Sequence, residues 1–215
     1  MADRRPALIA RCISTDDVIA AVRFARDHDL VIAVRGGGHS VAGFSTCDGG
    51  IVIDLSRMRG LTVDPKRRVA RAEGGAHLSQ LDREAQSFGL VCPVGVVGHT
   101  GVAGLTLGGG MGRLQRKHGY TIDNLLSVEL VTADGSRLRA SQDENPDLFW
   151  GLRGAGANFG VATLFEFQVH PQDATVTQGW VAVPVERSHE VGGLVREFVA
   201  TAPDEVFVNI NWRGF

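Results

Sequence analysis

Glycine is concentrated in three tracts of the chain, and these tracts constrain the fold more than any other feature of the sequence. They fall within residues 35–43, 95–112 and 151–160, and the chain holds 28 glycines among 215 residues. No Gly-Xaa-Yaa repeat or low-complexity run accompanies them, so we expect turns with positive φ or groups packed against the main chain. Consecutive amides in two such loops suit a pyrophosphate. Tight turns in a β-rich region explain the tracts equally well from the residues alone.

The spacing of the glycines departs from the common phosphate-binding signatures. The GxGxxG pattern fails because Val41 stands where the third glycine is required after Gly36 and Gly38, and no GxxxxGK[ST] segment occurs. NAD-binding Rossmann domains and P-loop NTPases therefore lose their sequence support. HExxH and GxSxG are also missing, which removes the zincins and the α/β-hydrolases in the same way.

Charge and hydropathy argue against two classes of partner. The chain has 22 basic and 24 acidic residues, a net charge of −2, and so lacks the basic surface of a nucleic-acid-binding protein. No apolar run approaches the ~20 residues that span a bilayer, and the first residues lack the apolar core of a signal peptide. We therefore expect a cytoplasmic protein with no nucleic-acid or membrane partner, unless an N-terminal extension carries an export signal.

Cysteine and histidine spacing predicts no metal site. Cys12, Cys47 and Cys92 form no CxxC pair, which is typical neither of a disulfide framework nor of a zinc knuckle. His39 follows the first glycine run, where a metal ligand, a base and an ordinary loop residue are all open interpretations. No second histidine or carboxylate stands at ligand spacing, so metal binding is the weakest of the three. From the residues alone, the ordinary loop histidine is the simplest.

Hydrophobic periodicity predicts alternating strands and helices. A capping signal at Ser14 begins a helix that, with strands at 7–10 and 31–34, forms a βαβ unit. The other expected elements are strands at 51–55, 61–63, 68–72 and 161–169, a hairpin at 127–141, and helices at 78–88 and 146–150. Beyond a boundary near 171–176 we expect a strand at 178–185, a helix at 187–200 and a strand at 205–212.

Seven motifs, in order, resemble one flavoprotein family. They are RGGGHSVAG at 35–43, DGG at 48–50, TGVAGLTLGGGMG at 100–112, RKHGYTIDN at 116–124, VTADG at 131–135, NPDLFW at 145–150 and RGAGANFGV at 153–161. In order and spacing they resemble the FAD-linked oxidases with a PCMH-type FAD-binding domain. The branch is berberine-bridge-enzyme-like and 6-hydroxynicotine-oxidase-like, within the vanillyl-alcohol-oxidase fold. The resemblance covers about residues 6–171.

The resemblance implies an α+β fold in two domains. Residues 1–173 would form a PCMH-type FAD-binding domain of two α/β subdomains, with the cofactor between them. Residues 174–215 would begin an α+β substrate-binding domain. Members of the family are much longer, so we expect the N-terminal part of the first domain and most of the second to be missing from this chain.

The resemblance also implies FAD as the cofactor, held by a defined set of positions. His39 would carry the flavin through a covalent bond from its imidazole to the 8α-methyl group, and Val161 would contact the adenine side through its backbone. The positions assigned to the FAD site are Arg35, Gly36, Gly37, Gly38, His39, Ser40, Gly43, Val97, Gly98, Thr100, Gly101, Gly104, Gly112, Asp123, Asn124 and Val161.

Three departures from the family pattern lie near these positions. Some members bind FAD a second time through a cysteine, and Val97 holds that place here, while Cys92 lies five residues earlier. A single covalent link is therefore expected, with Cys47 and Cys92 as small buried residues. His77 and Arg113 stand where relatives often have an aromatic residue and a tryptophan.

The resemblance implies an FAD-dependent oxidoreductase that oxidises a small organic substrate by hydride transfer to flavin, with O2 as the acceptor. The alternative is a truncated FAD-binding module without turnover, because the family's catalytic base and substrate pocket come mostly from segments outside this chain. A relative with non-covalent flavin is a third hypothesis, which the histidine at position 39 disfavours. No catalytic residue is therefore predicted, and substrate and oligomeric state stay open.

Overall fold

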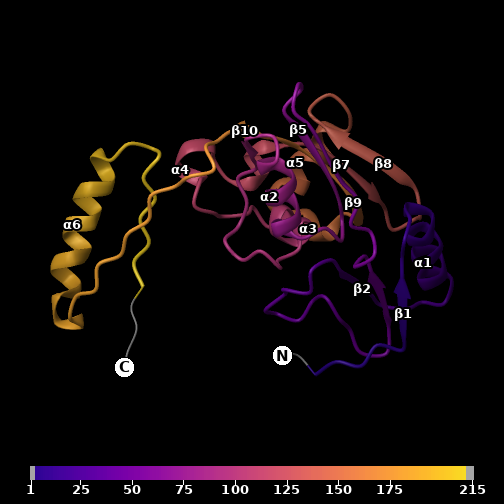
Figure 1. The fold of residues 1–215 in the computed structure, drawn as a ribbon. Coiled ribbons are helices and arrows are strands. Elements are labelled where there is room, and N and C mark those ends of the chain that lie inside the picture. The colour runs from indigo at the N-terminus through magenta and orange to yellow at the C-terminus, as the bar shows by residue number, and fades with distance from the viewer. Residues whose placement is uncertain (1–2, 212–215) are drawn as a thin grey trace.

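A three-stranded parallel sheet forms one side of the molecule. The computed structural model describes residues 3–211, and in it strand β3 (Ile51–Asp54) lies between β1 (Leu8–Arg11) and β2 (Ile32–Arg35). Helix α1 (Thr15–Asp27) joins β1 to β2 and packs against this sheet (Figure 1). The predicted βαβ unit is confirmed, with β3 inserted between its two strands.

The first turn of α1 shows how local sequence sets this helix. The Ser14 hydroxyl accepts a hydrogen bond from the Asp17 amide at 3.2 Å, and the Asp17 carboxylate accepts one from the Ser14 amide at 3.1 Å. This reciprocal cap pairs amides that a helix start otherwise leaves without partners. Apolar residues then recur every three or four positions, and Val18, Val22 and Ala25 are buried.

A five-stranded antiparallel sheet forms the other side. Its order is β4 (Leu61–Asp64), β5 (Val69–Glu73), β9 (Val161–Gln168), β7 (Leu125–Val131) and β8 (Arg137–Ser141). All five strands agree with the predicted segments. The central strand is β9, the last of the five in sequence, and its Phe165 and Phe167 are fully buried.

Helices α2 (Leu78–Gln86), α3 (Val102–Leu107) and α5 (Pro146–Ala155) contribute to the core of this sheet. Buried Leu81, Val102 and Leu152, one from each helix, belong to the same hydrophobic cluster as the β9 phenylalanines. Helix α3 lies inside the second glycine tract, where the sequence predicts no helix. Glycines on both sides hide its short apolar repeat.

The two sheets share part of one core. Val131 at the end of β7 and Val161 at the start of β9 pack in the same cluster as Val22 of α1. Next to this shared core, the Gly74 amide donates to the Thr163 carbonyl at 2.9 Å and extends the pairing of β5 with β9. The mixed helix and strand architecture agrees with the predicted α+β class. The loop after β2 and the loop before α3 lie between the two layers (Figure 1).

The chain beyond residue 171 lies apart from both sheets (Figure 1). Strand β10 (His170–Pro171) pairs with β6 (Leu90–Val91), and the chain then reaches the short turn η3 (Val185–Arg187) and helix α6 (Ser188–Thr201). The helix predicted at 187–200 is confirmed. Helix α4 (Gln115–His118) contacts this part, because Arg116 Nη2 donates to the Ala202 carbonyl at 2.9 Å.

The strands predicted at 178–185 and 205–212 are wrong within the described residues, which form no strand between 172 and 211; residue 212 lies outside them. Trp180 and Val181 are 85% and 88% exposed, so the first segment lies on no sheet. A strand requires a neighbour for its backbone groups, and the described strands are all elsewhere. The division into two domains at residue 173 stays a prediction.

Candidate functional site

The loop after β2 and the loop before α3 are pressed together, backbone to backbone. A Cβ atom added to Gly37 would overlap the Gly101 amide nitrogen, and one added to Gly101 would overlap that of Gly37. Only glycine permits this approach. The contact joins residues 36–39 to residues 98–101, and we call these two segments the paired glycine loops. Seven predicted site residues lie in them, and an eighth, Val97, lies directly before the second loop. The seven are Gly36, Gly37, Gly38, His39, Gly98, Thr100 and Gly101.

The first of the paired glycine loops and the turn that follows it present unpaired backbone amides. In the described part of the chain, the amides of residues 37–42 donate to no backbone carbonyl. The turn closes at its end, where the Gly43 amide donates to the Ser40 carbonyl and the Phe44 amide to the Ser40 hydroxyl, both at 3.0 Å. Gly38 has a φ of +74°. Consecutive amides held in such a turn suit phosphate oxygens, so this loop fits the pyrophosphate of a dinucleotide.

Positive side chains flank the same loop. A Cβ at Gly38 would lie 3.3 Å from Arg35 Nε, so the Arg35 guanidinium runs alongside the backbone of this turn. Arg4 Nη1 donates to the carbonyls of Gly43 and Thr46, both at 3.2 Å, and ties the N-terminal segment to the end of the turn. A cation beside free amides strengthens the preference for an anionic ligand.

The second of the paired glycine loops is anchored by helix α2. The Ser79 amide donates to the Gly98 carbonyl at 2.8 Å, and the Leu78 amide donates to the Thr100 carbonyl at 3.0 Å. Gly104, in α3, is exposed, and apart from its chain neighbours and the backbone of its own helix, no atom of the described residues lies within 4 Å of where its Cβ would be. A helical glycine costs about 1 kcal/mol relative to alanine, and protein packing offers no reason for it here. The space beside Gly104 fits a cofactor that approaches the helix backbone closely.

His39 projects from the first loop and is exposed. Its ring centroid lies 4.6 Å from that of His99, with the two planes tilted by 37°. A third histidine, His77, caps α2 and forms a backbone bridge with Gly101. Burial, and the positive fields of Arg59, His99 and His39, lower the pKa of His77. Sequence reasoning missed His99, although a histidine beside a glycine was the same signal that drew attention to His39.

The cysteines agree with the predicted buried role. Cys47 and Cys92 are 7% and 1% exposed. Burial, with a smaller contribution from Asp82, raises the pKa of the Cys92 thiol well above its usual value, which keeps it uncharged and unreactive. Val97 is 44% exposed and lies two residues before His99.

Asn124 and Asp123 have partners within the protein. Both lie in the short helix η1 (Thr121–Asn124), and Asn124 Nδ2 donates to the His118 carbonyl at 2.8 Å and the Tyr120 carbonyl at 2.9 Å. Its Oδ1 therefore accepts from His170 Nε2 at 2.6 Å, which places the His170 proton on that nitrogen. The Asp123 carboxylate accepts from the Tyr120 amide and pairs with Arg153 at 3.2 Å. These contacts hold the turn together; none involves the paired glycine loops.

Gly112 and Val161 are confined by packing. A Cβ at Gly112 would overlap the Val94 carbonyl oxygen. Val161 is 4% exposed, and its side chain lies in the core that the two sheets share. Only its backbone is available for a cofactor contact, as the resemblance implies.

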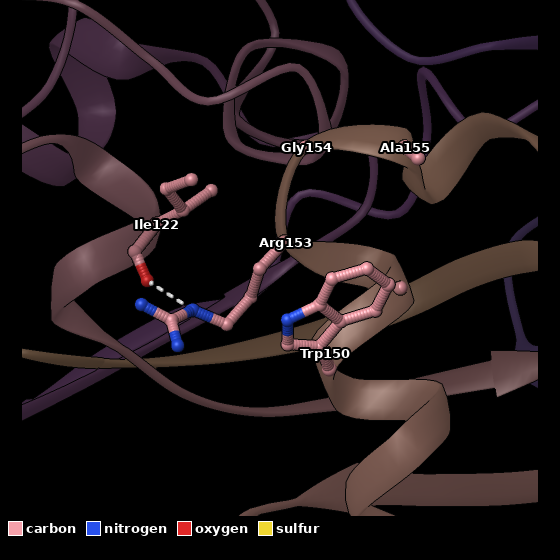
Figure 2. Close-up of a pocket in the computed structure, with 6 residues that line it drawn as sticks. Ile122, Trp150, Arg153, Gly154 and Ala155 are labelled. Carbon is pink, nitrogen blue, oxygen red and sulfur yellow. Dashed lines mark hydrogen bonds between the residues drawn. The ribbon is translucent and has the colours of Figure 1, made fainter.

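Two surface cavities lie elsewhere. One of about 430 Å³ is lined by Ile122, Trp150, Gly151, Arg153, Gly154 and Ala155. Figure 2 shows the Arg153 guanidinium turned toward the Ile122 carbonyl, its hydrogen-bond partner at 3.1 Å, and away from the Trp150 indole. The other, of about 450 Å³, lies between β1 and α1. Neither cavity includes a predicted FAD-site residue.

The described residues hold neither a metal-site cluster nor a membrane-spanning helix. Residues 3–211 hold no cluster of three or more His, Cys, Asp or Glu side chains with the geometry of a metal site. Over the same residues, every helix is too short or too polar to cross a membrane.

Comparison with known proteins places these features in one family. A family model described as an FAD binding domain matches residues 6–141. The (R)-6-hydroxynicotine oxidase of Paenarthrobacter nicotinovorans is 45% identical over 178 residues, which cover 83% of this chain and 39% of that protein. The crystal structure of 6-hydroxy-D-nicotine oxidase from Arthrobacter nicotinovorans has a TM-score of 0.78 at 46% identity, and covers 79% of this chain and 38% of that one.

Two further solved structures share the fold. BBE-like 1 of Physcomitrella patens has a TM-score of 0.74 at 33% identity, over 78% of this chain and 37% of that one. Glucooligosaccharide oxidase from Acremonium strictum, described with a 6-S-cysteinyl, 8α-N1-histidyl FAD, has a TM-score of 0.72 at 38% identity, over 78% and 36% of the two chains. The chain thus spans about two fifths of the length of the curated relative above, 39% of it.

Proposed function

This chain belongs to the FAD binding domain family, and from that premise we propose that it is the cofactor-binding part of an FAD-dependent oxidoreductase that oxidises a small organic molecule. When bound, FAD supplies hydride acceptance from a substrate C–H bond and passes the electrons to O2. The observation that carries the proposal is the pair of apposed glycine loops with unpaired amides beside an exposed histidine.

The paired glycine loops would bind the FAD pyrophosphate. The amides of residues 37–42 and the Arg35 guanidinium offer donors and positive charge on one loop. The exposed backbone of Gly104 offers close approach on the neighbouring helix. Because the two loops come from different layers of the fold, a ligand bound across them would also hold the layers together.

His39 would hold the flavin through one covalent bond from its imidazole. Its exposure leaves a ring nitrogen accessible, and the similar glucooligosaccharide oxidase is described with an 8α-N1-histidyl FAD. That same description includes a 6-S-cysteinyl link, for which this chain has Val97 and not a cysteine. Cys92 is buried, so it supplies no second link.

The substrate would be a small organic molecule. The similar proteins are named as oxidases of 6-hydroxynicotine and of glucooligosaccharides, two chemically unrelated classes. These proteins resemble this chain in the same part but are named for different substrates. This supports the proposal that this part binds FAD and that other residues select the substrate.

The test is to express the protein with FAD available, denature it in acid and examine the gel band for flavin fluorescence. We expect a fluorescent band from the unaltered protein and from His28→Ala, which removes an exposed histidine in α1's C-terminal cap. We expect a dark band from His39→Ala. A dark band from a yellow native protein would refute the covalent link and keep FAD binding. A colourless, folded protein would refute the cofactor itself.

A further inference from the structure

The His39 imidazole has one ring contact that fixes its direction. The side chain is exposed and follows Gly38, whose φ is +74°. An exposed imidazole on a glycine-rich turn ordinarily samples several rotamers. Here the ring lies 4.6 Å, centroid to centroid, from that of His99. A packed neighbour on one side restricts rotation about both side-chain bonds.

The backbone makes this meeting a fixed feature of the fold. His39 lies two residues after Gly37, and His99 lies two residues before Gly101, so both histidines stand at the same distance from the glycine contact. On the His99 side, the neighbouring carbonyls of Gly98 and Thr100 accept hydrogen bonds from the start of α2 at 2.8 and 3.0 Å. The His99 backbone is therefore held on both sides, and its exposed ring lies beside the His39 ring.

We propose that His99 is a positioning residue for the attachment of FAD: its ring holds the His39 imidazole in the orientation from which the covalent bond forms. The inference rests on the covalent link proposed above. A reacting group held in one orientation avoids an entropic cost that a freely rotating group must meet in the transition state.

The bond-forming step balances with O2 as the oxidant. An imidazole nitrogen of His39 bonds to the 8α carbon, while one C–H bond of that methyl group and the imidazole N–H bond are broken. The two protons and two electrons released pass to O2, which becomes hydrogen peroxide. His99 remains unchanged, and its part is to present the nitrogen.

The experiment compares four versions of the full-length protein: unaltered, His99→Ala, His99→Phe and His28→Ala. Each is prepared without flavin and mixed with FAD in air. Two quantities are followed over time: the flavin bound to the native protein, and the flavin retained in the acid-denatured gel band. His28 is the matched control, because its exposed ring also stacks on an aromatic neighbour, Phe24, at 4.2 Å. Thermal unfolding of each variant reports on folding.

We expect His99→Ala to slow covalent retention by about tenfold or more while native binding of FAD changes little. The ring of His99→Phe restores the rate to near that of the unaltered protein, and His28→Ala leaves it unchanged. An unaltered rate in His99→Ala would overturn the positioning role and leave the covalent link standing. A His99→Phe variant that folds and binds FAD but stays as slow as His99→Ala would also overturn it. Absence of retained flavin in the unaltered protein would instead refute the covalent link on which the role depends.

Discussion

The paired glycine loops and the C-terminal segment, residues 172–211, are built in opposite ways. In the loops, each backbone is confined by another segment distant in sequence. A Cβ atom added to either Gly37 or Gly101 would overlap the backbone of the other. In the C-terminal segment, α6 has no buried residue. The segment contacts the rest of the protein through polar groups, among them the ion pair of Arg116 with Asp204. Motifs are dense in the first region and absent from the second.

The difference shows what a local pattern can and cannot specify. A glycine that must accommodate another backbone leaves a clear mark in the sequence, because no other residue fits there. A strand leaves only a pattern of apolar residues in the sequence, and such a segment forms a strand only when a neighbouring strand is present to pair with it. Four predictions, from the largest expected effect to the smallest, test this comparison.

Gly37→Ala should destabilise the protein most. The new methyl group would meet the Gly101 amide, and neither backbone can retreat without breaking the contact between the layers, so we expect a loss of about 3 kcal/mol. Urea unfolding measures it. Gly104→Ala is the matched control, because its Cβ position is open in the described structure. That helical change should be neutral or stabilising by about 0.5–1 kcal/mol without FAD, yet weaken FAD binding. Equal losses in both variants would remove the distinction between confined and open glycines.

Asn124→Ala should cost about 2 kcal/mol, because it leaves two carbonyls and the His170 N–H without partners in a buried place. Asn124 is 5% exposed, so water does not readily replace the amide. The control is Gln172→Ala, which removes an exposed side-chain amide hydrogen bond to the Asp173 carbonyl. A difference in unfolding free energy below about 0.5 kcal/mol between the two variants would contradict the role given to burial.

Asp82, on α2, should make stability depend on pH. Burial raises its pKa from 3.8 to about 6, so the folded state favours the neutral carboxyl. This contribution to stability is fully present below pH 3.8 and is lost as pH rises through about 6. The loss is about 1 kcal/mol after allowance for partial exposure to solvent. Asp82→Asn should remove this part of the pH dependence of the unfolding free energy. Glu84→Gln, an exposed acid on the same helix, should retain it.

Arg116→Ala should have the smallest effect on global stability, about 0.5 kcal/mol, since its ion pair with Asp204 is 3.8 Å long and Asp204 is exposed. The same change removes the hydrogen bonds to the Val199 and Ala202 carbonyls, so protease cleavage within 172–184 should accelerate. A large drop in the unfolding temperature would show that the C-terminal segment is integral to the core, contrary to the comparison.

The fold was predictable where periodicity and capping act locally. The Ser14 cap, the alternation along 161–168 and the turn at Asp134 all led to the observed elements. Helix α3 was not, because glycine flanks it on both sides. The strands at 178–185 and 205–212 were predicted wrongly because pairing depends on a neighbour that the pattern does not describe.

The candidate site was predictable in part. The glycine runs and His39 were evident from the sequence, and the structure brings Gly37 and Gly101 together as adjacent loops. The meeting of His39 with His99 could not be read from the sequence, because it depends on the register with which two backbones cross. Asn124 was placed at the cofactor through resemblance, and this placement stays a prediction; its described contacts are hydrogen bonds within the protein.

The central position of β9 has a consequence for the order of events during synthesis. Residues 69–73 of β5 pair with residues 164–168 of β9. The five-stranded sheet therefore cannot form until the chain up to residue 168 has left the ribosome. Strand pairings so far apart in sequence form slowly, because the entropy lost in closing a long loop precedes the hydrogen bonds that compensate for it. Until then the Gly74 amide lacks its Thr163 partner. Completion of the five-stranded sheet is therefore a late step, because β5 waits for a partner about 95 residues further along the chain.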